Sequence, residues 1–223
     1  ILNRSFDGFT YAPETIRKVE NAAKKQGYIP NFHARSLRTK RSMIIGLVVP
    51  SGIPYFSGTL VENIERELRP FGYETIVGHS ISDHTAESRL VKAMISKGID
   101  GLFWIPNGKK LRPDSFQLDA SFPLVLLDRP GCSSKFPTVI TDNTAASEEL
   151  AKRIKLSGHS TITMLTSEKN DDSILERESG IRRVFGANIH KITCVNEIEA
   201  ARQSIQPMLT NLEGTALVCL SQN

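Results

Sequence analysis

The chain is poor in residues that build covalent or metal-bound frameworks. It has three cysteines in 223 residues, Cys132, Cys194 and Cys219, which are far apart and form no Cys-x-x-Cys pair. An odd, scattered set argues against a disulfide framework and against a zinc site. The histidines show no metal-ligand spacing either. We therefore interpret the cysteines as small buried apolar residues and expect no metal and no cofactor.

Long apolar runs and export signals are also lacking. No run approaches the ~20 apolar residues that span a bilayer. The first residues, ILNRSFDGFT, have none of the features of a signal peptide. The signatures GxGxxG, GxxxxGK[ST], GxSxG and HExxH are missing as well. These absences predict a cytoplasmic protein that is neither membrane-bound nor an enzyme, although an α/β scaffold by itself does not exclude catalysis.

Charge is present but unevenly distributed. Residues 1–42 contain nine Lys or Arg and three Asp or Glu, a net charge of +6. The remaining 181 residues contain 19 basic and 21 acidic side chains, a net charge of −2. A basic arm on a near-neutral body is typical of a protein that contacts nucleic acid, although basic termini are often merely solvated.

The basic arm has helical signals. Pro13 and Glu14 suit the first turn of a helix, and Gly27 suits its end. Asn31 can cap a second, short helix over residues 32–38. That second helix is too short to be stable alone in water, because helix nucleation is costly. We expect it to form only against a partner surface.

From Met43 onward, apolar strands alternate with amphipathic helices. This alternation predicts βαβ units around parallel sheets, and thus an α/β fold. Ligands in such sheets bind at the carboxyl ends of the strands. The predicted strands cover residues 43–49, 74–77, 101–105, 123–127, 138–140, 161–165, 191–195 and 216–220, and the predicted helices cover 57–70, 84–97, 144–156, 175–185 and 197–212.

Two successive sets of strands indicate two stacked lobes, with the break near residues 141–144. The predicted organisation is a basic helical segment (1–30), a short helix and linker (31–42), an N-terminal lobe (43–141) and a C-terminal lobe (142–223). The chain ends directly after a strand, so we expect the C-terminal lobe to be incomplete here and the natural protein to be longer.

The run IRKVENAAKKQGYIPNFHARSLRTKRSMIIGLVVP, residues 16–50, resembles the lac-repressor family of transcription regulators. The resemblance continues through GIDGLFWIP (98–106), FPLVLLDRP (122–130), VITDN (139–143) and LSGHSTITML (156–165). Leu-Asp-Arg at 127–129 and Arg-Glu-Ser-Gly at 177–180 are most similar to the fructose and sucrose repressors. The resemblance implies a periplasmic-binding-protein-like core of two lobes. It also implies that residues 1–30 are part of a DNA-binding helix-turn-helix headpiece and that residues 31–42 are a hinge helix and linker.

The same resemblance implies how the arm meets operator DNA. Leu37 corresponds to a residue that wedges into the minor groove when two hinge helices pair, as minor-groove binders commonly do. The alternative without a DNA contact is that Leu37 packs on the core and that the neighbouring arginines are solvated. The full set of implied DNA-contact residues is Asn3, Thr10, Tyr11, Thr15, Asn31, Ala34, Arg35, Leu37 and Arg38.

An effector cleft between the lobes is implied as well. Ser51, Tyr55 and Phe56 follow the first core strand, where an aromatic side chain could stack on a sugar, or could simply cover a helix end. Asp128 and Arg129 follow the fourth strand, where they could grip hydroxyls or a phosphate, or could form a surface ion pair. Arg177 matches an effector-contacting arginine, and Gln222 occupies the place of a polar amide in the cleft.

Together these features predict a sequence-specific DNA-binding repressor of sugar-utilisation genes. Its partners would be operator DNA, a sugar or sugar phosphate such as fructose, fructose phosphate or sucrose, and a second copy in a homodimer, possibly a tetramer. A periplasmic-type sugar-binding protein without DNA binding is the alternative, since it shares the two-lobed core. The basic arm and the missing export signal favour the repressor.

Overall fold

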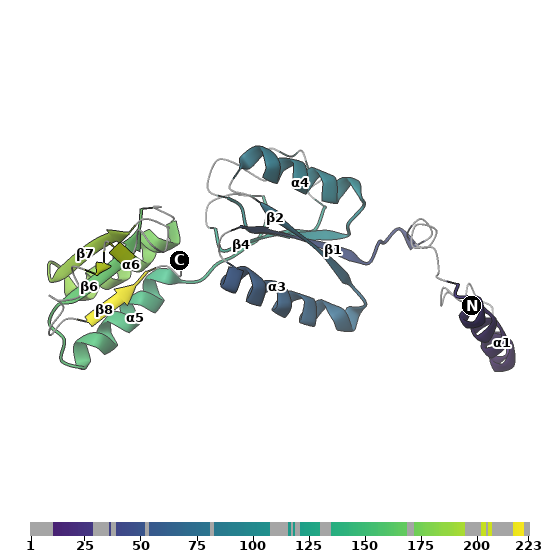
Figure 1. Ribbon diagram of the computed structural model, residues 1–223, viewed down its shortest axis with the longest axis horizontal. Coiled ribbons are helices and arrows are strands. Elements are labelled where there is room, and N and C mark those ends of the chain that lie inside the picture. The colour runs from purple at the N-terminus through teal and green to yellow at the C-terminus, as the bar shows by residue number, and fades with distance from the viewer. Residues whose placement is uncertain are drawn as a thin grey trace.

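The computed structural model describes residues 11–28, 36, 39–51, 54–80, 83–107, 116, 118, 121–129, 135–168, 172–194, 202–203, 205–206 and 216–220; the side chains of residues 54 and 55 are outside this set. The described elements form two α/β units preceded by one helix, α1, at Pro13–Lys25 (Figure 1). Among these residues, no helix combines the length and apolarity needed to cross a membrane.

The first unit is a five-stranded sheet in which every neighbouring pair is parallel, in the order β2-β1-β3-β4-β5. Helices cover both of its faces, α4 on one and α3 on the other (Figure 1). Its elements are β1 (Ile44–Pro50), α3 (Pro54–Leu68), the 3-10 helix η1 (Arg69–Phe71), β2 (Glu74–Ser80), α4 (His84–Ser96), β3 (Gly101–Trp104), β4 (Leu124–Leu127) and β5 (Thr138–Val139).

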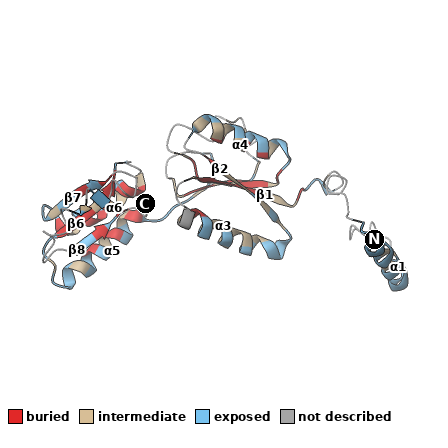
Figure 2. Ribbon diagram, viewed as in Figure 1, coloured by how far each residue is buried: buried red, intermediate tan, exposed pale blue. Residues whose placement is uncertain are grey.

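The core of this unit lies on both sides of β1. Val48 packs with Val91 and Met94 of α4 and with Trp104 of β3, and Val49 packs under Phe56 and Leu60 of α3. A strand covered on both faces needs a continuous apolar run, which explains why IIGLVVP does not alternate. The buried residues follow the strands and the inner helix faces (Figure 2).

Glycine allows α4 to approach the sheet closely. A β-carbon at Gly78 would lie 2.7 Å from Leu90 Cδ1, and one at Gly46 would lie 2.8 Å from Ile99 Cδ1. Both distances are shorter than real carbon contacts. A side chain at either glycine would therefore require the ends of these neighbouring side chains to move.

The second unit is a three-stranded parallel sheet in the order β7-β6-β8. Its core joins Ile162 and Met164 of β6 to Ala151 of α5 and to Ile181 and Phe185 of α6. The elements are α5 (Asn143–Leu156), β6 (Ile162–Ser167), α6 (Asp172–Phe185), β7 (Ile189–Cys194) and β8 (Ala216–Cys219).

The predicted α/β alternation is confirmed, with differences at the ends of elements. α3 begins at Pro54 instead of residue 57, because proline fits the first turn of a helix. β2 continues to Ser80 because all seven of its residues pair with β1. α6 begins at Asp172, where an acidic residue suits the positive end of the helix. Apart from Ser36, which is helical, the predicted short helix 32–38 lies outside the described residues, as does most of the helix 197–212.

The prediction of three buried cysteines is wrong for one of them. Cys194 is buried, whereas Cys219 is exposed and Cys132 lies outside the described residues. β8 turns Val218 inward and leaves Leu217 and Cys219 on its outer side. The prediction failed because it treated all three cysteines alike and did not consider which face of a strand each one occupies.

Candidate ligand-binding site

The carboxyl ends of the first sheet meet at one edge, and this edge carries several of the predicted ligand contacts. Ser51 follows β1, and its N–H donates to Ser80 O at the end of β2 over 3.0 Å. A cavity of about 330 Å³ opens beside it, lined by Pro50, Ser51, Ser57, Gly58, Val61, Val77 and His79. The structure thus places Ser51 at a hollow on the side of the sheet that α3 covers.

Two aromatic residues, Tyr55 and Phe56, were predicted at this edge, and the structure describes the side chain of Phe56. Phe56 is half-buried and packs against the cluster of Val49, Ile105 and Leu127. This packing agrees with the simpler interpretation of an aromatic that covers the start of α3. The side chain of Tyr55 lies outside the described set.

Asp128 and Arg129 follow β4 at the same edge. Asp128 has φ of 60°, in the left-handed region, and its N–H donates to Val139 O over 2.9 Å. Its Oδ2 lies 4.0 Å from Arg129 Nε, and the two side chains are only 21% and 12% exposed. The two residues therefore form a partly buried ion pair with each other, as the alternative interpretation expected, although the pair is less exposed than a surface pair.

The second sheet carries Arg177 at its carboxyl edge. Arg177 Nε donates to Asn143 Oδ1 and Arg177 Nη1 donates to Leu220 O, both over 2.8 Å. These bonds tie α6 to the start of α5 and to the chain just after β8. Gln222 follows shortly after Leu220 but lies outside the described residues. Arg177 is half-buried, and these two hydrogen bonds fix the orientation of its guanidinium.

The residues of the motif Arg-Glu-Ser-Gly, 177–180, contribute both to the carboxyl edge of the second sheet and to the packing of the second unit. Glu178 is buried and accepts from Lys191 Nζ of β7 over 2.7 Å and from Arg182 Nε over 2.8 Å. Burial raises the pKa of the Glu178 carboxyl, but the hydrogen bonds from Lys191 and Arg182 outweigh it, so the pKa is lowered. Gly180 faces α5, where any side chain would overlap Ser147 and the Thr144 carbonyl.

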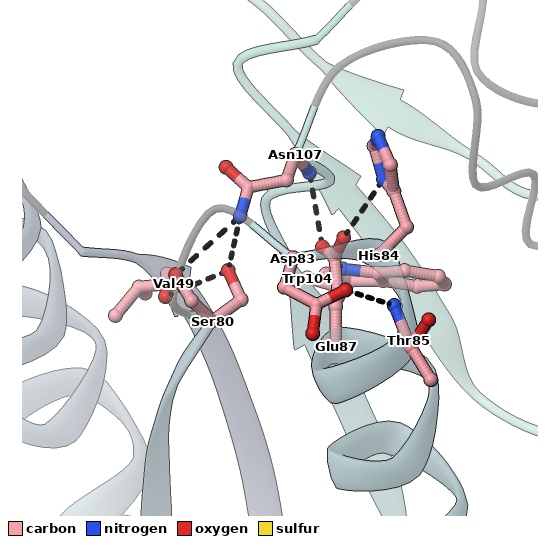
Figure 3. Close-up of polar contacts among 8 residues, drawn as sticks. All are labelled: Val49, Ser80, Asp83, His84, Thr85, Glu87, Trp104 and Asn107. Carbon is pink, nitrogen blue, oxygen red and sulfur yellow. Dashed lines mark hydrogen bonds and ion pairs between the residues drawn. The ribbon is translucent and has the colours of Figure 1, made fainter.

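Sequence reasoning missed a polar network at the first edge (Figure 3). Glu87 of α4 is completely buried and binds both Trp104 and the backbone of Asn107. Asn107 in turn donates to Ser80 at the end of β2. Glutamate at the start of a helix is usually a solvated residue, so its position alone did not distinguish it. A lone tryptophan in a buried strand, which requires an acceptor for its N–H, was the available signal.

The basic arm is described only in part. α1 has no buried residue, and Ile16, Val19 and Ala23 on its apolar side are half-buried. Tyr11 and Thr15 are both exposed. The other predicted DNA contacts, Asn3, Thr10, Asn31, Ala34, Arg35, Leu37 and Arg38, lie outside the described residues.

Two parallel sheets in sequence, with polar side chains at their carboxyl edges, define an α/β protein of the periplasmic-binding-protein type. Residues 42–223 match the family described as periplasmic binding proteins and sugar binding domain of LacI family. The chain therefore belongs to this family and, with curated relatives that are transcriptional regulators, to its LacI branch.

Two curated relatives illustrate the similarity. The probable HTH-type transcriptional regulator EndR of Paenibacillus polymyxa is 30% identical over 207 residues, which cover 90% of this chain and 60% of that protein. The sucrose operon repressor of Klebsiella pneumoniae is 34% identical over 154 residues, which cover 69% of this chain and 46% of that protein. The chain thus spans about half to three fifths of the length of these relatives.

The fold also matches solved structures. The Cra transcriptional dual regulator of Pseudomonas putida, solved in complex with fructose 1-phosphate, superposes with a TM-score of 0.64 at 22% identity. The match covers 79% of this chain and 68% of that one. At this level of identity the comparison establishes the fold alone.

Proposed function

We propose that this chain is the greater part of a DNA-binding transcription repressor of sugar-utilisation genes, controlled by a sugar or sugar phosphate bound at the carboxyl edges of its sheets. The observation that carries the proposal is a basic segment, residues 1–42, which contains the helix α1 and precedes a LacI-type core in the sequence. A sugar-binding domain alone does not require a net charge of +6 in its first 42 residues, whereas a protein that binds DNA does require basic side chains.

The junction between arm and core supports a mechanical role for the arm. Asp100, just before β3, accepts from Ser42 N at 2.7 Å, from Ser42 Oγ at 2.8 Å and from Met43 N at 2.9 Å. Three hydrogen bonds to one carboxylate hold the chain firmly where it enters β1, and charge-assisted bonds are the stronger kind. These bonds fasten the last residue of the arm, Ser42, to the core, so a movement of the core at Asp100 would also move Ser42.

The chemistry of the edges suits a small polyhydroxylated ligand. The pair Asp128 and Arg129 offers carboxylate acceptors and a guanidinium, and Arg177 offers a second guanidinium that is already oriented. Arginine binds phosphate in a fork, so a sugar phosphate such as fructose phosphate would use Arg129 and Arg177. A neutral sugar such as fructose or sucrose would rely on Asp128 and on Ser51 and Tyr55. Ligand binding would shift operator affinity through its different affinity for two core states.

The proposed organisation follows from this role. Residues 1–30 form part of the headpiece, residues 31–42 the hinge helix and linker, and residues 43–141 and 142–223 the two lobes. Hinge helices act in pairs, so the protein would work as a homodimer, possibly a tetramer, on chromosomal DNA in the cytoplasm. Phosphate contacts by the arm would make operator affinity fall steeply with salt.

Fluorescence anisotropy with the full-length protein tests the proposal. Labelled DNA from the upstream region of its own gene is titrated at low salt, with and without fructose, fructose 1-phosphate, fructose 6-phosphate and sucrose. We expect binding to the upstream DNA at least tenfold tighter than to a scrambled duplex, and a change in affinity with one of the sugars. The full-length protein without residues 1–42 should lose operator binding and retain sugar binding in a thermal-shift assay. Indifference of the intact protein to DNA would refute the proposal.

A further inference from the structure

The start of α4 contains a carboxylate with no exposure to solvent. Glu87 is 0% exposed, and its Oε1 accepts from Trp104 Nε1 at 2.8 Å and from the backbone N–H of Asn107 at 2.9 Å (Figure 3). A buried carboxylate is expensive unless both oxygens are satisfied. Here both bonds fall on one oxygen.

The other oxygen faces His84, one helical turn earlier. Glu87 Oε2 and His84 Nδ1 are 3.9 Å apart, both are buried, and neither has a hydrogen-bond partner among the described residues (Figure 3). One proton between these atoms would satisfy both after a small closing movement. The His84 side chain is 39% exposed, so the pair can exchange that proton with solvent.

His84 is the ionisable partner of Glu87 in the described part of the chain. The elements packed against this side of α4 contribute Val48 of β1, Gly78 of β2 and Trp104 of β3, which carry no titrating group. His79 of β2 lies on the opposite face, at the cavity beside α3. The pKa of Glu87 is raised. Burial raises it, and this effect outweighs the hydrogen bonds from Trp104 and Asn107 and the charge of His84, which lower it.

The network continues from Glu87 to the ligand edge. Asn107 Nδ2 donates to Ser80 Oγ at 2.9 Å, and Ser80 Oγ donates to Val49 O at 3.3 Å (Figure 3). Ser80 O also accepts from the N–H of Ser51. The position of Asn107 therefore fixes the ends of β1, β2 and β3 relative to one another.

We propose that Glu87 is a positioning residue of the ligand edge, and that a proton shared with His84 sets how firmly it holds the turn at Asn107. An ionised carboxylate accepts stronger hydrogen bonds than a neutral acid. Loss of the shared proton therefore tightens the turn, and gain of the proton loosens it. The link to ligand binding rests on the proposed function; the proton coupling does not.

Trp104 is the single tryptophan of the chain and reports directly on Glu87. Tryptophan emission is followed from pH 4.5 to 8.5 in the full-length protein, with any tryptophan outside these 223 residues replaced by phenylalanine. The wild-type background is compared with the Glu87→Gln, His84→Ala and His190→Asn variants. Glutamine keeps an acceptor for Trp104 and Asn107, places an amide N–H toward His84 and does not titrate. His190 is exposed on β7 and is the matched control.

We expect a sigmoidal change in emission in the wild type and in His190→Asn, none in Glu87→Gln, and a midpoint moved by about one pH unit in His84→Ala, as coupled sites require. A flat wild-type profile, or the same transition in Glu87→Gln, would overturn the proposal. An unmoved midpoint in His84→Ala would overturn the sharing of the proton.

Hydrogen exchange of peptides spanning residues 104–107, corrected for the intrinsic effect of pH, tests the positioning. Protection in the wild type should rise about tenfold on the high-pH side of the transition and stay constant in Glu87→Gln. Constant protection in both proteins would contradict the positioning role. Neither measurement needs a ligand, so failure of every tested sugar to bind would count against the proposed function and not against this inference.

Discussion

Gly180 of α6 lies directly against Ser147 of α5, so closely that no β-carbon fits between the two helices. The Thr144 carbonyl and the backbone N–H of Glu148 crowd the same point. Two of these neighbours are backbone atoms, which cannot swing aside. This contact sets the distance between α5 and α6, and with it the position of Arg177 one turn earlier.

Gly180→Ala should therefore destabilise the protein although alanine favours helices. We expect the free energy of unfolding to fall by about 2–3 kcal/mol, the cost of overpacking a rigid contact. Gly58→Ala is the matched control, because Gly58 is also helical and an added β-carbon there meets nothing within 4 Å. That variant should be neutral or more stable by up to about 1 kcal/mol. Urea denaturation measures both, and equal effects would show that the α5–α6 contact can relax.

Arg177→Ala should weaken sugar-phosphate binding and also lower stability. The Arg177 side chain donates hydrogen bonds to Asn143 Oδ1 and to the Leu220 carbonyl, and its removal leaves each of these acceptors one hydrogen bond short. Bonds to a charged group contribute about 1.5–3 kcal/mol, so we expect a loss in that range by urea denaturation. Calorimetry with fructose 1-phosphate should show affinity reduced at least tenfold.

Arg183→Ala serves as the control for Arg177, because Arg183 lies on the same helix, α6, and makes an exposed ion pair with Glu148 of α5. Its affinity for fructose 1-phosphate should equal that of the wild type. Arg177→Ala with reduced stability and unchanged affinity would restrict Arg177 to a structural role.

Glu178→Gln should make the free energy of unfolding less dependent on pH in the acidic range. The pKa of Glu178 is lowered in the folded protein, since the bonds from Lys191 and Arg182 outweigh burial, and its ordinary value is 4.5. Its stabilising contribution is thus present above that value and is lost as the pH falls through the lower folded-state pKa. We expect Glu178→Gln to be less stable than the wild type by about 1 kcal/mol at pH 7, with the difference vanishing toward pH 3.

The control for Glu178 is Glu149→Gln, which breaks an exposed i,i+4 pair with Arg153. Exposed pairs contribute little, so this variant should track the wild type at every pH within about 0.5 kcal/mol. Urea denaturation between pH 3 and pH 7 measures the differences. A gap for Glu178→Gln that grows toward low pH would contradict the assignment.

Leu37→Ala should weaken specific DNA binding far more than non-specific binding. A leucine wedge acts only where the duplex is kinked, whereas the basic arm attracts any DNA. Anisotropy with operator and scrambled duplexes measures the ratio, which should fall at least tenfold. Leu156→Ala is the control. Leu156 is the last residue of α5 and is 87% exposed, so this variant should change neither affinity. Equal losses on both duplexes would argue against a wedge.

Local sequence signals explain why most elements were predictable. The apolar run of β1 requires two covered faces, Pro13 and Gly27 bound α1, and the alternation of strands and helices leaves little choice but parallel sheets. The placement of Ser51, Asp128 and Arg177 at carboxyl edges follows from the same topology. These features depend on neighbours in sequence, so the sequence by itself determined them.

Contacts between distant segments were decided only by the tertiary structure. Glu87 reads as a solvated helix residue until α4 packs over β3, 17 positions later, and puts its carboxylate under Trp104. From the sequence, Gly180 suggests a weak point in a helix, and only the packing of α5 against it shows why glycine is needed there. Cys219 suggests a buried residue, and only the structure shows that it lies on the exposed face of β8. Burial and hydrogen bonding at these sites depend on what the fold brings near, and no local pattern encodes that neighbourhood.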